Sequence, residues 1–236
     1  MITGNRIRTA ILDIPGGAMC FDSSRIQSPS DQLFNPGNPQ LEATSVQVGG
    51  RQSAWFVRAE FGSAVLRHYR RGGMIARISR DRYIWTGASS TRSFAEFRIL
   101  QELHSLGVKV PAPLAAAYWR SGPFYRAAIL IERIQGVRTL AEAPAHPHAV
   151  ARAIHAMHRA GIWHADLNAY NVLLDQTGQV WLIDFDRARR RTMSTSLRQA
   201  NLLRLRRSLL KVAGQNGAQY WSQVQQAYEQ IAADYR

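Results

Sequence analysis

The feature that most constrains the fold is a polar loop followed directly by a short hairpin. The loop runs His164-Ala-Asp-Leu-Asn-Ala-Tyr-Asn171, and two apolar segments follow it on either side of the turn residues Gln176-Thr-Gly178. Apolar runs separated by such a turn predict two antiparallel strands. The second segment ends at Asp184. Because the hairpin returns the chain, we expect Asp184 to meet Asn171.

The residue types and spacing match the catalytic set of protein kinases, in which His-x-Asp-Leu-x-x-x-Asn precedes Asp-Phe. Phosphoryl transfer from ATP needs a carboxylate to orient the attacking hydroxyl and accept its proton, and oxygen ligands to hold Mg²⁺ on the phosphates. We therefore assign Asp166 as catalytic base and Asn171 and Asp184 as Mg²⁺ ligands. His164 is interpreted as a brace of the loop.

Strand and helix patterns are divided unevenly along the chain. The N-terminal half carries strand-like segments between residues 44 and 69, an amphipathic helix over residues 93–103 and a buried strand over residues 127–132. The C-terminal half carries a helix over residues 149–160, the hairpin, and a mostly helical tail from about residue 194.

This order predicts an α+β chain with a bilobal protein-kinase-like fold. The predicted N-terminal lobe, residues 1–131, has an antiparallel sheet with one helix and clamps ATP. The predicted C-terminal lobe, residues 132–236, is helical, reduced in size and carries the catalytic loop. Glu132 and Ile134 fall in the expected hinge, whose backbone groups would bind adenine.

The expected ATP clamp has two further parts. Gly49 and Gly50 lie between two strand segments, where backbone N–H groups can approach phosphates; their spacing is not G-x-G-x-x-G, so a plain hairpin turn is the alternative. Arg67 stands where protein kinases carry a strand lysine, and it can bridge Glu96 to the phosphates. A guanidinium differs from an ammonium in shape and donors, and an ordinary exposed helix residue is the alternative for Glu96.

Composition restricts the partners. The formal net charge of +14 favours polyanions such as nucleic acid, anionic lipid or a phosphorylated substrate. No stretch approaches the ~20 apolar residues of a spanning helix, and the N-terminus lacks the long apolar centre of a secretory signal. The single cysteine, Cys20, excludes an internal disulfide. No zinc finger, helix-turn-helix or RNA-binding motif is visible, so we expect no nucleic-acid partner.

Longer runs resemble the kinases of 3-deoxy-D-manno-octulosonic acid (Kdo) in lipopolysaccharide core synthesis. The resemblance covers most of the chain, and arginine at the third-strand position is usual in that family. The specific runs are Leu66-Arg-His-Tyr-Arg-Arg-Gly-Gly73 and His164-Ala-Asp-Leu-Asn168, and Asp81-Arg-Tyr-Ile-Trp-Thr-Gly87 and Trp181-Leu-Ile-Asp-Phe-Asp-Arg187 continue the match.

The resemblance implies ATP-dependent phosphorylation of the 4-hydroxyl of Kdo on a Kdo-lipid A precursor, at the cytoplasmic face of the bacterial inner membrane. Two features of the sequence agree. No long activation segment follows Asp186, which favours a small acceptor over a peptide. The tail alternates leucines with Arg198, Arg204, Arg206, Arg207 and Lys211, a basic amphipathic pattern suited to an anionic membrane surface or to the acceptor's anions.

Two alternatives stay open at this point. Another kinase of the same fold, acting on heptose, a small molecule or a protein, would share Asp166, Asn171 and Asp184. Without catalysis, the charge would suit a basic binding protein for nucleic acid.

Overall fold

The computed structural model describes residues 7–46, 54–70 and 81–235. The chain divides into two compact units. Unit 1 comprises Met1–Gln101 and Ala112–Arg133, and unit 2 comprises Glu102–Pro111 and Ile134–Arg236. Within the described residues no helix is both long and apolar enough to cross a membrane.

Unit 1 is built on an antiparallel sheet with the order β1-β2-β7-β8-β5-β4-β3, and β6 also pairs with β8. The three strand segments predicted between residues 44 and 69 form β3, β4 and β5 as a meander. The strands are β1 (Thr9–Ile14), β2 (Gly17–Asp22), β3 (Thr44–Ser45), β4 (Ala54–Ala59), β5 (Gly62–His68), β6 (Tyr83–Ile84), β7 (Pro113–Ser121) and β8 (Phe124–Glu132).

The two faces of this sheet are covered differently. Side chains alternate along a strand, so Leu66 of β5 enters a core with Phe34 and Leu41 from the 3-10 turns Asp31–Phe34 and Pro39–Leu41. Its neighbour Arg67 points to the opposite face, where it reaches α1. The alternation of β5 thus sends one side chain into the core and the next toward the helix.

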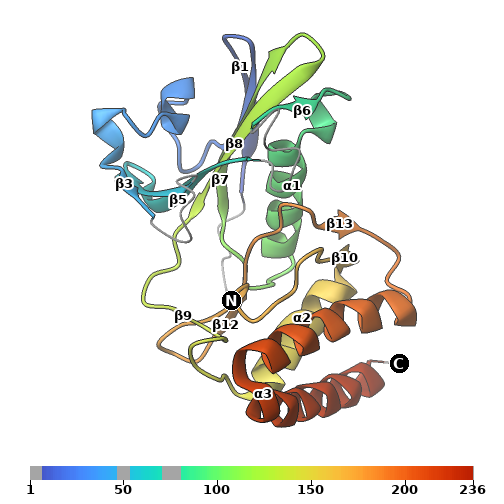
Figure 1. Ribbon diagram of the computed structural model, residues 1–236. Helices are drawn as coiled ribbons and strands as arrows, with labels where there is room; N and C mark the ends of the chain where they lie inside the picture. The colour runs from blue at the N-terminus through green and yellow to red at the C-terminus, as the bar shows by residue number, and fades with distance from the viewer. Residues whose placement is uncertain (1–6, 47–53, 71–80, 236) are drawn as a thin grey trace. The chain divides into compact units, whose positions relative to one another are not determined.

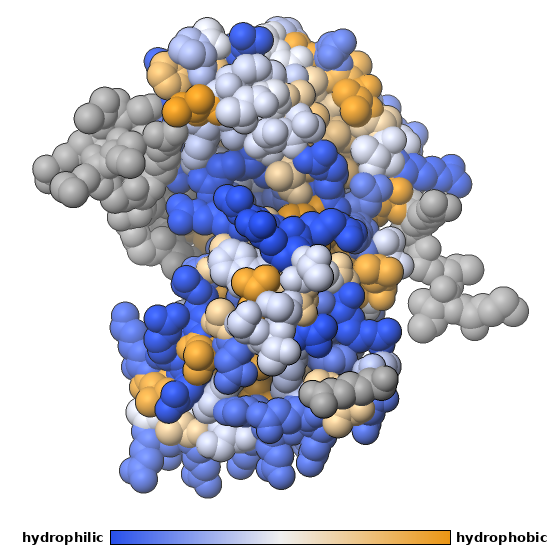
Figure 2. Space-filling view, turned by 90° about the vertical axis from the view of Figure 1, so that its right-hand side faces the viewer, coloured by the Kyte–Doolittle hydropathy of each residue, from blue (hydrophilic) through white to orange (hydrophobic). Residues whose placement is uncertain are grey.

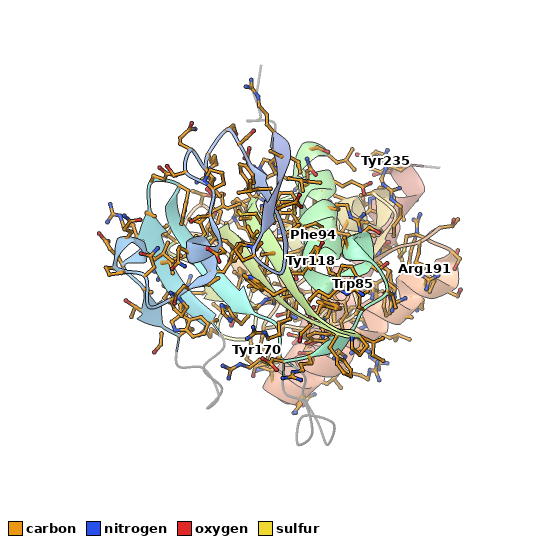
Figure 3. All side chains as sticks on the ribbon, turned by 90° about the horizontal axis from the view of Figure 1, so that it is seen from above. Trp85, Phe94, Tyr118, Tyr170, Arg191 and Tyr235 are labelled. Carbon is orange, nitrogen blue, oxygen red and sulfur yellow. The ribbon has the colours of Figure 1, made fainter. Side chains whose placement is uncertain are left out.

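Helix α1 (Arg92–Ser105) agrees with the predicted amphipathic helix and its spacing of three. The apolar residues that recur along its inner face, Phe94, Phe97, Leu100 and Leu103, are all buried. Figure 3 shows Phe94 close to Tyr118 of β7, with the two ring centroids 5.3 Å apart, and the Tyr118 ring in turn lies 4.9 Å from that of Trp85. This packing fixes α1 against the sheet and so fixes the carboxylate that α1 carries.

Unit 2 contains α2 (Pro147–Arg159), α3 (Thr195–Asp234), one pair of short strands and one sheet of three short strands. In Figure 1, α3 doubles back on itself beside α2. The reversal occurs at Gly214, with φ of 52°, a conformation that glycine adopts without steric cost. The strands are β9 (Arg138–Thr139), β10 (Ile162–Trp163), β11 (Val172–Leu174), β12 (Val180–Leu182) and β13 (Arg189–Arg190).

The surface fits the charged composition. On the face drawn in Figure 2, hydrophobic residues are scattered among hydrophilic ones. Scattered apolar residues of this kind are normal on a protein surface.

Candidate active site

His164, which is fully buried, supports the catalytic loop of unit 2 through hydrogen bonds to its backbone. Its Nε2 lies 2.9 Å from the Ile183 carbonyl oxygen, and its Nδ1 accepts a hydrogen bond from the Asp166 N–H at 3.1 Å. Burial lowers the pKa of His164 below that of a free imidazole, against the effect of the Ile183 hydrogen bond. The neutral ring donates through Nε2 and accepts through Nδ1, so it serves the bracing role that the sequence suggests.

The backbone around Asp166 is fixed, while its carboxylate is open to solvent. The Asn171 side-chain amide donates to the Asp166 carbonyl oxygen at 2.8 Å, and Asn168 donates to the same oxygen at 3.1 Å. The Asp166 side chain is 57% exposed. A carboxylate held by a rigid loop and reachable from outside has the geometry that a general base needs.

The hairpin brings Asp184 next to Asn171. In its register Val172 pairs with Leu182, and the Ile183 N–H donates to the Asn171 carbonyl oxygen at 3.1 Å. Asp184 has φ of 63°, in the left-handed region. Such a conformation is uncommon outside glycine and is found in functional sites. The structure therefore brings together the two predicted Mg²⁺ ligands at the open end of the hairpin.

A cavity of about 640 Å³ in unit 2 contains Asp166 and Asp184. It is open, and its walls are strongly charged. Its lining residues are Trp163, Ala165, Asp166, Asp184, Asp186, Arg187, Arg189 and Arg204. Three carboxylates and three guanidinium groups thus share one cavity, a composition suited to anionic ligands rather than to an apolar molecule.

Helix α3 contributes Arg204 to this cavity. Arg204 Nη1 lies 3.3 Å from Asp166 Oδ1. The sequence groups Arg204 with Arg206, Arg207 and Lys211 on one basic surface. The structure separates them, because the other three are exposed to solvent while Arg204 lies against the catalytic loop.

In unit 1 the structure brings Arg67 and Glu96 together. Arg67 Nη2 on β5 lies 2.7 Å and 2.5 Å from the two carboxylate oxygens of Glu96 on α1. Glu96 is buried, and the hydroxyl of Tyr69 donates to the same carboxylate. The exposed-residue alternative for Glu96 is therefore wrong: a buried carboxylate with two donors is held in a fixed position.

The expected hinge begins at the end of β8. The Glu132 N–H donates to the Ala112 carbonyl oxygen at 2.8 Å, and the Arg133 N–H donates to the Ser63 carbonyl oxygen at 3.0 Å. The Glu132 side chain pairs with Arg25 at 3.0 Å. Ile134 is half-buried. The predicted phosphate-binding residues Gly49 and Gly50 lie outside the described residues.

The histidines of the α2 region differ in burial: His155 and His158 are buried, whereas His146 is exposed. His158 Nδ1 lies 2.8 Å from the Tyr228 hydroxyl and its Nε2 lies 3.2 Å from Asn201 Oδ1. Burial lowers the pKa of His158 to about 4, so the ring is neutral near pH 7. In the described part of the chain, no three His, Cys, Asp or Glu side chains are grouped to hold a metal ion.

Sequence reasoning missed two residues of these sites. Tyr69 is a second donor to Glu96, and it follows Arg67 at the spacing that places both on one face of an extended strand. Asn201 is fully buried and holds the His164 backbone at both its N–H and its carbonyl oxygen, at 3.1 and 2.6 Å. A polar residue among the leucines of an amphipathic helix was the available signal for Asn201. Arg204 was predicted only as one of several cations suited to a membrane surface or to the acceptor's anions, and no sequence signal distinguished it from the others.

Comparison with known proteins gives one family. Residues 40–228 match the lipopolysaccharide kinase (Kdo/WaaP) family. A protein of Xylella fastidiosa is 53% identical over 205 residues, which cover 84% of this chain and 82% of its own. A protein of Stenotrophomonas maltophilia is 48% identical over 225 residues, which cover 93% and 89%. A protein of Xanthomonas axonopodis pv. citri is 52% identical over 204 residues, which cover 84% and 82%.

Each of these relatives is named 3-deoxy-D-manno-octulosonic acid kinase. The family match spans well over half of the chain, and the identities extend over most of it. The protein is therefore an ATP-dependent kinase and belongs to the lipopolysaccharide kinase (Kdo/WaaP) family.

Proposed function

We propose that the protein transfers the terminal phosphoryl group of ATP to the 4-hydroxyl of Kdo on a Kdo-lipid A precursor. The observation that carries the proposal is the exposed Asp166 carboxylate in a charged cavity that also contains Asp184. The names of the relatives supply the acceptor, since each is called a kinase of this acidic sugar.

In this mechanism Asp166 accepts a hydrogen bond from the acceptor hydroxyl and takes its proton as the oxygen attacks phosphorus. The bond from phosphorus to the bridging oxygen breaks, and ADP leaves with that oxygen. His164 and Asn171 hold the loop backbone, so the carboxylate does not need to reorganise during the reaction.

The Asn171 and Asp184 side chains fit a magnesium ion. Magnesium prefers oxygen ligands and few protein groups. The Asn171 amide nitrogen already donates to the loop backbone, which leaves its carbonyl oxygen as the ligand atom. Asp184 offers carboxylate oxygens at the end of the same hairpin. When bound there, Mg²⁺ would neutralise charge on the phosphates of ATP.

On the nucleotide side we propose that Arg67 contacts the phosphates while Glu96 and Tyr69 hold its guanidinium in place. Gly49 and Gly50 would supply backbone N–H groups to the phosphates. Because the Glu132 and Arg133 N–H groups are engaged, we assign adenine to the Glu132 carbonyl oxygen and the Ile134 N–H.

We further propose the bilobal arrangement of protein kinases for the chain. Residues 1–131 would form the lobe that clamps ATP, and residues 132–236 the lobe that carries the catalytic loop. The antiparallel sheet with one helix in unit 1, and the loop, hairpin and helices of unit 2, support this proposal.

Attachment to the anionic cytoplasmic face of the inner membrane is part of the proposal. The part of α3 before Gly214 exposes Leu203 and Leu210, which are two helical turns apart. The cations Arg206, Arg207 and Lys211 are exposed between and beside these leucines. Apolar and basic side chains on one surface helix favour binding to anionic lipid. Each cation near such a surface contributes roughly 1 kcal/mol.

The test is transfer of label from radioactive ATP to a panel of acceptors: a Kdo-lipid A precursor, a heptose-bearing core, an aminoglycoside and a peptide. We expect label on the Kdo-lipid alone, and its loss with Asp166→Ala. Label on the heptose-bearing core or on the peptide, without label on Kdo, would replace this function by one of the alternatives that the sequence leaves open.

A further inference from the structure

The ion pair between Asp166 and Arg204 is not explained by the chemistry proposed so far. Arg204 Nη1 lies 3.3 Å from Asp166 Oδ1, so a permanent partner would occupy a carboxylate oxygen that the acceptor hydroxyl needs. Both side chains are partly exposed, at 57% for Asp166 and 42% for Arg204, and ion pairs that water reaches contribute little to stability. Neither catalysis by Asp166 nor folding therefore accounts for an arginine at this position.

The position of Arg204 is nevertheless built into the fold. One turn before it, the fully buried Asn201 binds the His164 backbone, and one turn after it the Ser208 hydroxyl oxygen accepts a hydrogen bond from the Ala169 N–H at 3.1 Å. Residues three and four apart lie on one helix face. The α3 face formed by Asn201, Arg204 and Ser208 is thus fixed along the catalytic loop.

Two more arginines line the same cavity. Arg187 follows Asp186 in the turn after the hairpin, and Arg189 lies on β13, where it pairs with Trp163 of β10. In the proposed function Asp184 is committed to the metal. Three guanidinium groups then share the cavity with two remaining carboxylates, one of which must meet the acceptor hydroxyl.

Guanidinium groups bind carboxylates and phosphates through paired hydrogen bonds. The hydroxyl that Asp166 activates must come from a molecule that also tolerates three arginines around it, so that molecule carries negative charge close to the hydroxyl. The acid sugar named in the relatives carries a carboxylate of its own. A phosphate on the attached lipid has the same chemistry at a greater distance from the sugar hydroxyl.

We propose that Arg204, Arg187 and Arg189 form an anion subsite for the acceptor, in which Arg204 leaves Asp166 and binds the acceptor's carboxylate or phosphate. This inference rests on the proposed function and extends it. The incoming anion takes over the guanidinium, and Asp166 is left to bind the hydroxyl. Selection of an anionic acceptor and release of the base thus become one event.

The experiment measures steady-state kinetics of purified full-length protein with a soluble Kdo glycoside, its carboxyl methyl ester and a lipid-linked Kdo acceptor with and without lipid phosphates. The variants are Arg204→Gln, Arg204→Lys and Arg189→Gln. Arg190→Gln is the matched control, because Arg190 neighbours Arg189 on β13 but pairs with Glu102 outside the cavity. Thermal unfolding followed by circular dichroism confirms that each variant is folded.

We expect Arg204→Gln to raise the KM for the glycoside about tenfold to a hundredfold, the loss of one charge-assisted hydrogen bond, with the KM for ATP unchanged. Arg204→Lys should recover part of the loss, and Arg189→Gln should act in the same direction. The methyl ester should be a poor acceptor for the unmodified protein, and Arg204→Gln should add little to that defect. If the KM of the unmodified protein rises only when the lipid phosphates are removed, the phosphate is the anion that Arg204 binds.

Two results would overturn the subsite while leaving the kinase function intact. One is Arg204→Gln and Arg189→Gln matching Arg190→Gln on every acceptor. The other is a methyl ester that is as good an acceptor as the acid, together with a lipid acceptor that is equally good with and without its phosphates. Failure of the unmodified protein to phosphorylate any Kdo acceptor would overturn the proposed function itself, and the subsite with it.

Discussion

The site residues of unit 1 and those of unit 2 each include an arginine–carboxylate pair, and the two pairs differ in their exposure to solvent. In the pair of Arg67 and Glu96, the glutamate side chain is 1% exposed and also binds Tyr69. In the pair of Arg204 and Asp166, water reaches both side chains, which are 42% and 57% exposed. A buried charge that loses its partner is costly, whereas an exposed one is rehydrated. We infer that the first pair is a fixed support and the second can exchange partners.

The largest effect should come from removing the exposed carboxylate. Asp166→Ala removes the base that orients the acceptor hydroxyl, so turnover should fall by about 10²- to 10⁴-fold. Because the side chain is exposed, unfolding and the binding of magnesium-ATP should change little. Turnover near that of the unmodified protein would end the assignment of Asp166.

Disrupting the buried pair of Arg67 and Glu96 should lower the stability of the fold. Glu96→Ala leaves Arg67 and Tyr69 without their shared acceptor in a mostly dry site, and we expect a loss of about 3 kcal/mol in the free energy of unfolding. Urea denaturation measures it, with Asp166→Ala as the matched loss of a carboxylate from an exposed pair. Equal destabilisation by the two variants would break the comparison.

Replacing the proposed metal ligand Asp184 should have a smaller effect on activity than replacing Asp166. Asp184→Asn keeps the shape of the side chain but removes a negative charge, so the magnesium-dependent affinity for ATP should fall about tenfold. Titration calorimetry with and without Mg²⁺ separates this loss from a loss of nucleotide contacts. If magnesium-ATP affinity and turnover both survive, Asp184 is not a ligand.

Charge and shape can be separated at Arg67. Arg67→Ala should reduce kcat/KM for ATP about tenfold more than Arg67→Lys does, because lysine keeps the charge beside Glu96 but not the paired geometry. Equal loss in both variants would show that guanidinium geometry decides. Full activity in both would remove Arg67 from the site.

The smallest effect per residue should come from the solvent-facing cations of α3. Replacing Arg206, Arg207 and Lys211 by glutamine should weaken binding to anionic vesicles by roughly 1 kcal/mol per cation. Added salt should likewise weaken the binding of the unmodified protein to these vesicles. Vesicle sedimentation measures both. Arg204→Gln is the comparison variant. If it weakens vesicle binding as much as the substitution of Arg206, Arg207 or Lys211 does, Arg204 belongs to their surface and not to the cavity.

Local spacing made most of the unit 2 site predictable. The loop and hairpin between His164 and Asp184 are close in sequence, so their residue types alone placed Asn171 beside Asp184. Contacts between distant segments were not visible in the same way. Arg204 meets Asp166 only because Asn201 and Ser208 set the rotation of α3, and a pattern of leucines and arginines does not fix that rotation to one residue.

In the sheet, the short meander was predicted because its strands alternate and its turns contain glycine. Strand β7 was missed, apart from its extended start at Pro113, because Leu114-Ala-Ala-Ala-Tyr-Trp119 is rich in alanine, which strands disfavour. Its burial between β2 and β8 overrides that preference. The pairing of Arg67 with Glu96 was predicted because a strand cation and a helix glutamate at these places belong to the kinase pattern.

The most direct test of the account is to locate the transferred phosphate. The purified protein is incubated with ATP, Mg²⁺ and a Kdo-lipid A precursor, and the product is mapped by phosphorus and proton NMR, in parallel with Asp166→Ala. The account predicts one new phosphate ester at the 4-position of Kdo, absent with the variant. Phosphate on another sugar or on the lipid, or the same product from Asp166→Ala, would contradict it.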